Sequence, residues 1–287
     1  MNIALATAAV RSIGPELLTG LVLSLLGAFV LVGWLEAPAR IVWAALGIYL
    51  AIAWMVGSNW PARHRSFGWP NRVTLLRITL VAILAAALLF PELYRHHGLL
   101  MAALAMVVLL LDGVDGWLAR ALNASSAFGA RFDMEADSLL VLVLSIAVFS
   151  TGTAGPWVLA IGLLRYLFVG LGRLRPWLAG ELPDSARRKW ICVIQVLALS
   201  IAVAMPASQT LFTASIDPIA VRLMLAGALM LLTASFALDM VWLAGRHRRR
   251  STAESEAFQA EADSESAGLA AGASDTTTPF NDSRRQT

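Results

Sequence analysis

Two pairs of aspartates are the residues of this sequence best suited to chemistry. Asp112 and Asp115 lie three apart near the end of one apolar run, and Asp133 and Asp137 lie four apart at the start of the next. Spacings of three and four place each pair on one face of a helix. Because a short linker joins the two runs, the sequence predicts that all four carboxylates converge.

Converging carboxylates need a positive partner. They repel one another, and an acid at mid-bilayer costs about 2.5–3.5 kcal/mol on insertion scales. The hard cations Mg²⁺ and Mn²⁺ remove this repulsion, because they favour oxygen ligands and bridge to phosphate. Four carboxylates suit two such ions, which can clamp a phosphoryl group between attacking and leaving oxygens. The pattern therefore predicts phosphoryl transfer assisted by two divalent ions.

The residues between the two pairs fit the same chemistry. Gly116 and Gly129 lack side chains, so a ligand can approach the backbone closely there. Arg120, about one turn past Asp115, can bind a phosphate through charge-assisted hydrogen bonds. The alternatives are that the acids only cap the two helices and that Arg120 only anchors the chain at the membrane surface.

The elements that carry these residues are predicted to be transmembrane helices. The chain is 58% hydrophobic and 14% charged, whereas soluble domains carry about 25% charged residues. A transmembrane helix needs about 20 apolar residues. Eight runs qualify, which predicts an all-α integral membrane protein. They lie near 16–35, 39–57, 71–90, 98–119, 130–150, 156–173, 189–206 and 219–244.

The basic residues predict how these helices are oriented. They gather between the second and third runs, between the sixth and seventh, and after the last, whereas the opposite linkers hold only Arg95. The positive-inside rule then places the aspartates and both termini in the cytoplasm. The membrane is expected to be a bacterial inner membrane. Such clusters fit membrane flanks and not a nucleic-acid surface. The clusters are Arg63, Arg65 and Arg72; Arg173, Arg175, Arg187, Arg188 and Lys189; and Arg246, Arg248, Arg249 and Arg250.

The sequence divides into three parts. Residues 1–60 form a two-span N-terminal extension, and 61–247 form a six-span membrane domain. Residues 248–287 are rich in Ala, Ser, Thr, Glu and Asp. They have no sustained apolar face, so this tail is predicted to be disordered.

The aspartate segment resembles the signature of the CDP-alcohol phosphotransferases. That signature is D-x-x-D-G-x-x-A-R, about eight residues, then G-x-x-x-D-x-x-x-D, and every fixed position matches here. The segment Pro70–Arg77 is similar, more weakly, to the opening of the family's first core span. The resemblance implies a six-span core over roughly residues 65–245. The matching residues are Asp112, Asp115, Gly116, Ala119, Arg120, Gly129, Asp133 and Asp137.

The resemblance also implies roles for these residues. The first three aspartates would hold metal, and Asp137 would complete the metal site and deprotonate an acceptor hydroxyl. That hydroxyl would attack the phosphorus of CDP-diacylglycerol and release CMP; a covalent phosphatidyl-aspartate is the alternative route. Asn71 and Thr74 could face the cytidine or diphosphate. The residues implied for the nucleotide pocket are Gly116, Ala119, Arg120 and Gly129.

The acceptor is the least constrained part of this hypothesis. Clustered basic residues favour an anionic acceptor such as glycerol 3-phosphate, with Arg165, Arg173 and Lys189 as candidate contacts. Inositol phosphate, phosphatidylglycerol, serine and choline are the alternatives. The resemblance further implies a homodimer. A transporter with an acidic cation path is the alternative from another class, but it predicts acids near mid-bilayer.

Overall fold

The described part of the chain is helical. The computed structural model describes residues 3–60, 67–122, 126–175, 177, 186–211 and 217–274, and it contains no strand in these ranges. The chain forms two units. The first comprises residues 1–170 and 183–236, and the second comprises 171–182 and 237–287. The prediction of an all-α membrane protein is confirmed.

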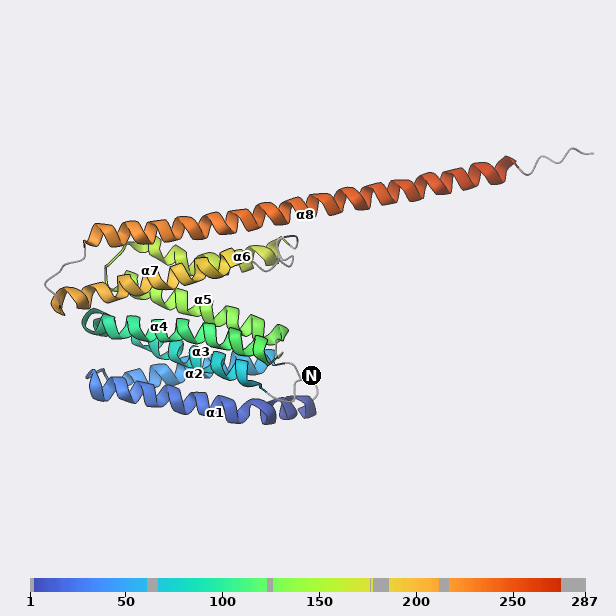
Figure 1. The fold of residues 1–287 in the computed structure, drawn as a ribbon. Coiled ribbons are helices and arrows are strands. Elements are labelled where there is room, and N and C mark those ends of the chain that lie inside the picture. The colour runs from blue at the N-terminus through green and yellow to red at the C-terminus, as the bar shows by residue number, and fades with distance from the viewer. Residues whose placement is uncertain are drawn as a thin grey trace, which may run out of the picture. The chain divides into compact units, whose positions relative to one another are not determined.

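Each predicted apolar run coincides largely with one α-helix of Figure 1, and its ends extend at most three residues beyond that helix. Seven of the described helices are long and apolar enough to cross a membrane. α5 has the length, but its first half carries Asp133, Glu135 and Asp137. The elements are α1 (Ile3–Trp34), α2 (Arg40–Asn59), α3 (Trp69–Ala87), α4 (Pro91–Ala121), α5 (Ala127–Ser150), the 3₁₀ helix η1 (Pro156–Val158), α6 (Leu159–Leu174), α7 (Ala186–Leu211) and α8 (Pro218–Ser274).

Local sequence signals explain where the site helices begin. α3 and α4 each have proline in the first turn, at Pro70 and Pro91, where a missing N–H costs no hydrogen bond. α5 begins after Ser126, whose hydroxyl accepts a 3.0 Å hydrogen bond from the Gly129 amide. This cap satisfies an otherwise unpaired donor, and it sets the register of every acid that follows on α5.

α4 and α7 approach each other closely within the first unit. A side chain at Gly98 on α4 would overlap the carbonyl oxygen of Val203 on α7. Directly before this glycine, His97 leaves helical geometry with φ −118° and ψ 24°. α4 therefore contains a kink at the point where the sequence predicted the apolar run to begin.

Two apolar clusters hold the first unit together. The larger is built mainly from α3, α4, α5 and α7, with contributions from α1, α2 and α8. The smaller joins α1, α2, α3 and the first turns of α5. Because α3 packs against α1, α2, α4 and α5, it is the central helix of the region that contains the aspartates. The smaller cluster consists of Ile13, Ile52, Val56, Trp60, Phe67, Leu75, Ile78, Ala82, Phe132 and Ala136.

α8 continues far beyond its apolar part. The stretch that could span a membrane ends at Arg249, and the helix is described to Ser274. Thr252, Ser255 and Gln259 are exposed. Residues 275–287 of the predicted tail lie outside the described residues.

Candidate active site

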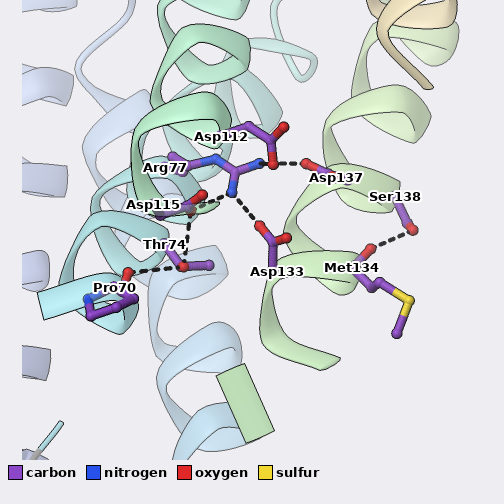
Figure 2. A network of polar contacts seen from close by, with 9 residues as sticks. All are labelled: Pro70, Thr74, Arg77, Asp112, Asp115, Asp133, Met134, Asp137 and Ser138. Atoms are coloured by element: carbon purple, nitrogen blue, oxygen red, sulfur yellow. Dashed lines mark hydrogen bonds and ion pairs between the residues drawn. The ribbon is translucent and has the colours of Figure 1, made fainter. Parts of the chain in front are cut away.

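A single arginine lies at the centre of the aspartate cluster (Figure 2). The Arg77 side chain on α3 is fully buried. Its Nη1 donates to Asp115 Oδ2 at 2.6 Å and to Asp133, and its Nη2 donates to Asp137. Nη2 also lies 3.1 Å from Asp112 Oδ1. One guanidinium therefore contacts all four carboxylates predicted to converge.

Three helices supply these side chains. Asp112 and Asp115 lie in the last three turns of α4, and Asp133 and Asp137 lie in the second and third turns of α5. Arg77 enters from the third turn of α3. Its planar fork of five N–H donors suits this task, since several carboxylates can be bound in fixed geometry at once.

The cluster remains strongly negative despite Arg77. Four carboxylates at −1 each and one guanidinium at +1 leave a formal charge of −3. Removing charges from water costs several kcal/mol per ion, and attraction offsets this cost only when the charges are matched. The cluster is thus short of positive charge, which favours binding of a cation.

The oxygens are placed for a hard metal ion. Asp112, Asp133 and Asp137 each offer a carboxylate oxygen within 4.8 Å of the others. Asp115 Oδ1 is buried, and it has no hydrogen-bond partner among the described residues. A donor set of oxygen atoms suits Mg²⁺ or Mn²⁺. The structure therefore contains an aspartate group that could hold a divalent ion.

Exposure differs across the cluster. The Asp115 side chain is 4% exposed and that of Asp112 is 14% exposed, whereas those of Asp137 and Asp133 are 28% and 36% exposed. The α4 pair is therefore the buried half of the site. The α5 pair is the half that a substrate can reach from solvent.

Thr74 on α3 contacts an acid of the cluster, and Asn71 lies about one turn before it on the same helix. The Thr74 hydroxyl lies 3.1 Å from both Asp115 Oδ2 and the Pro70 carbonyl oxygen, and it can donate to only one at a time. Asn71 donates to the Phe67 carbonyl at 2.6 Å. A Cβ at Gly129 would lie 2.9 Å from Asn71 Oδ1, so α3 and α5 meet at this glycine.

The α4 residues of the motif are placed less tightly. A Cβ at Gly116 would make ordinary contact with Arg120 Nη1 at 3.6 Å. Arg120 is exposed in the last turn of α4. Ala119 lies on the same helix, and only its backbone is described. Within the described residues, the site is open around Gly116 and crowded around Gly129.

The three candidate acceptor residues lie on α6 and α7. Arg165 Nη2 lies 3.0 Å from Glu135 Oε1, so this arginine pairs with an acid outside the cluster. Lys189 is exposed in the first turn of α7. Arg173 is exposed in the last turn of α6 and belongs to the second unit. Their assignment to the acceptor stays a prediction.

Arg77 is the site residue that sequence reasoning missed. A signal for it exists, because an ionisable residue inside an apolar run is a functional candidate by default. Arg77 also follows Thr74 by three residues, which places these two on one helical face. Its four partners lie 35 to 60 residues away in sequence, so the contacts themselves could not be read from local spacing.

Comparisons with known proteins agree with this geometry. The chain is 33% identical over 153 residues to a CDP-diacylglycerol–glycerol-3-phosphate 3-phosphatidyltransferase of Pseudomonas fluorescens, covering 49% of this chain and 74% of that protein. It is 29% identical over 164 residues to a probable phosphatidylglycerophosphate synthase of Mycobacterium tuberculosis, covering 57% and 78%. It is 31% identical over 147 residues to a CDP-diacylglycerol–glycerol-3-phosphate 3-phosphatidyltransferase of Bacillus subtilis, covering 46% of this chain and 76% of that protein.

No solved structure matches the chain significantly. Residues 67–233, more than half of the chain, match the CDP-alcohol phosphatidyltransferase family. This range contains Arg77, all four aspartates and Gly129, at which α3 and α5 meet. The chain belongs to the CDP-alcohol phosphatidyltransferase family, and it is a membrane-bound phosphotransferase.

Proposed function

We propose that this protein transfers the phosphatidyl group of CDP-diacylglycerol to the free hydroxyl of glycerol 3-phosphate and releases CMP. The observation that carries the proposal is the convergence of four aspartates on the buried Arg77, in a chain of this family. Relatives named for this donor and acceptor support the choice of substrates. The clustered basic residues also suit an anionic acceptor.

The four aspartates are proposed to hold two divalent ions, Mg²⁺ or Mn²⁺. When bound, such ions supply Lewis-acid stabilisation of the charge that develops on the diphosphate. The formal charge of −3 and the unpaired Asp115 Oδ1 support this ligand set. Arg77 holds the carboxylates in place from the buried side, so that the cluster is preorganised before substrate binds.

The partly exposed Asp137 is proposed to be the general base. One of its oxygens accepts a hydrogen bond from Arg77 Nη2, which leaves the other oxygen for the proton of the acceptor hydroxyl. The acceptor oxygen forms a bond to the phosphorus that carries the diacylglycerol, and the bond from that phosphorus to the CMP oxygen breaks. A base acts this way when it lies within hydrogen-bond reach of the hydroxyl.

Asn71, Thr74 and Gly129 are proposed to contact the cytidine diphosphate. Thr74 reaches Asp115, and Asn71 faces Gly129 across the α3–α5 contact. This group is therefore continuous with the acids. Gly116, Ala119 and Arg120 would bind the nucleotide from the α4 side.

The protein is proposed to lie in a bacterial inner membrane with its active site in the cytoplasm. The distribution of arginines in the sequence supports this orientation, because short cytoplasmic loops carry the excess of basic residues. A homodimer is part of the proposal by family resemblance alone, and cross-linking in native membranes tests it.

The test is release of CMP by purified protein with CDP-diacylglycerol, metal ion and a panel of acceptors. Glycerol 3-phosphate is expected to support release, and inositol phosphate, phosphatidylglycerol, serine and choline are not. Asp137→Asn should lower kcat by about 10²–10⁴-fold. Glu92→Gln, an exposed acid at the opposite end of α4, should leave it unchanged. Release with another acceptor alone would reassign the substrate, and no release with any acceptor would refute the reaction.

A further inference from the structure

The helices α1 and α2 lie before the region that matches the family, yet they are packed against the site. The family match begins at residue 67, whereas the smaller apolar cluster includes Ile13 of α1 and Ile52 and Val56 of α2. Arg72, next to Asn71, forms an ion pair of 2.6 Å with Glu16 of α1. The extension is thus joined to the helix that carries Arg77.

The end of α2 reaches α5 through aromatic rings. Trp60, directly after α2, is 6% exposed. Its ring meets that of Phe128 edge-on with centroids 5.0 Å apart, and it lies 5.3 Å from that of Phe67. Phe128 and Phe132 stack at 5.7 Å, and Phe67 contacts Phe132 at 6.5 Å. These four rings, the aromatic cluster, connect the end of α2, the segment before α3 and the start of α5.

Each member of the aromatic cluster on α5 directly precedes a residue of the site. Phe128 precedes Gly129, and Phe132 precedes Asp133. Successive residues on a helix are fixed relative to each other, so a shift of these rings moves the glycine and the carboxylate. Phe67 acts on the other side, because its carbonyl accepts the hydrogen bond from Asn71.

We propose that Trp60 of the N-terminal extension is a positioning residue for the metal-binding carboxylates. Through Phe128 and Phe132 it sets the distance between α5, which carries Asp133 and Asp137, and α3, which carries Arg77. The two extra helices are then a working part of the active site. This inference rests on the proposed function, but its main readout, metal binding, does not require turnover.

The experiment compares Trp60→Leu and Trp60→Phe with Trp54→Leu. Trp54 lies on α2, six residues before Trp60, and is 76% exposed, so it controls for loss of a tryptophan from the N-terminal extension. Binding of Mn²⁺ without nucleotide is followed by the electron paramagnetic resonance signal of the free ion. Melting temperature and CMP release are measured on the same samples.

Trp60→Leu is expected to weaken Mn²⁺ binding by about 10-fold or more, the usual effect of losing a residue that orients metal ligands. Its melting temperature should fall by several degrees, because a smaller side chain replaces a buried ring, so Mn²⁺ binding is measured well below that temperature. Trp60→Phe, which keeps a ring against Phe128, should recover most of the affinity, and Trp54→Leu should match the wild type.

Two results would overturn the inference. One is wild-type Mn²⁺ affinity in Trp60→Leu, and the other is an equal loss in Trp54→Leu. If Trp60→Leu does not fold, Phe128→Leu tests the same contact from α5; failure of both to fold means that Trp60 serves stability alone and also overturns the inference. Absence of CMP release by the wild type refutes the proposed function separately, and the Mn²⁺ comparison still stands.

Discussion

Acidic and basic side chains meet at both ends of α4, but they are exposed at one end and buried at the other. At its start, Glu92 and Arg95 form an ion pair with side chains 65% and 45% exposed. Near its end, Asp112 and Asp115 share the fully buried Arg77 with two further acids. One exposed acid paired with one exposed arginine leaves no net charge. Four acids around one buried arginine carry an excess of negative charge, which favours binding of a cation.

The largest effect should follow removal of the buried charge. Arg77→Met leaves four acids together without a counter-charge, and breaking a buried ion pair from one side costs about 3–5 kcal/mol. Thermal unfolding in detergent should show a lower melting temperature than the wild type. Added Mg²⁺ should raise it by more in the variant than in the wild type, because a ligand that binds only the folded state stabilises it. Equal Mg²⁺ shifts in the two proteins would contradict the role of Arg77 as counter-charge.

How much of this site was predictable depends on how far apart its parts lie in sequence. The two aspartate pairs were predictable because helical geometry fixes positions three and four residues apart. The family and the reaction class were predicted from that motif and are confirmed. Arg77 was not identified, because only the packing of α3 between α4 and α5 turns an arginine inside an apolar run into the centre of a cluster.

The helices could be predicted from the sequence, but the way in which they pack could not. Eight apolar runs are a property of local composition, and all eight are helices in the structure. The packing of the extension against α3 and α5 is not visible in composition, because the contact of Trp60 with Phe128 joins residues of two separate helices. Apolar contacts are not specific to particular residue pairs, so the sequence does not show which apolar side chains meet. Shape complementarity in the folded chain decides this.

A smaller effect is expected where α3 and α5 touch. Gly129→Ala places a Cβ 2.9 Å from Asn71 Oδ1 and 3.1 Å from Ser126 Oγ, so the Asn71 amide must move. Alanine also favours the helix by about 0.5–1 kcal/mol over glycine, which offsets the crowding. We therefore expect little change in melting temperature but a KM for CDP-diacylglycerol raised several-fold. Gly113→Ala, with open space around its Cβ, is the matched control; an unchanged KM in Gly129→Ala would separate Asn71 from donor binding.

The smallest effect belongs to the exposed end of α4. A double-mutant cycle with Glu92→Ala, Arg95→Ala and both together should give a coupling energy of about 0.2–1 kcal/mol, because solvent screens an exposed pair. The coupling should shrink further in high salt, since the Debye length falls to about 3 Å at 1 M. CMP release should not change in any of the three variants. A coupling as large as the loss expected for Arg77→Met would mean that burial is not what distinguishes the ion pairs at the two ends of α4.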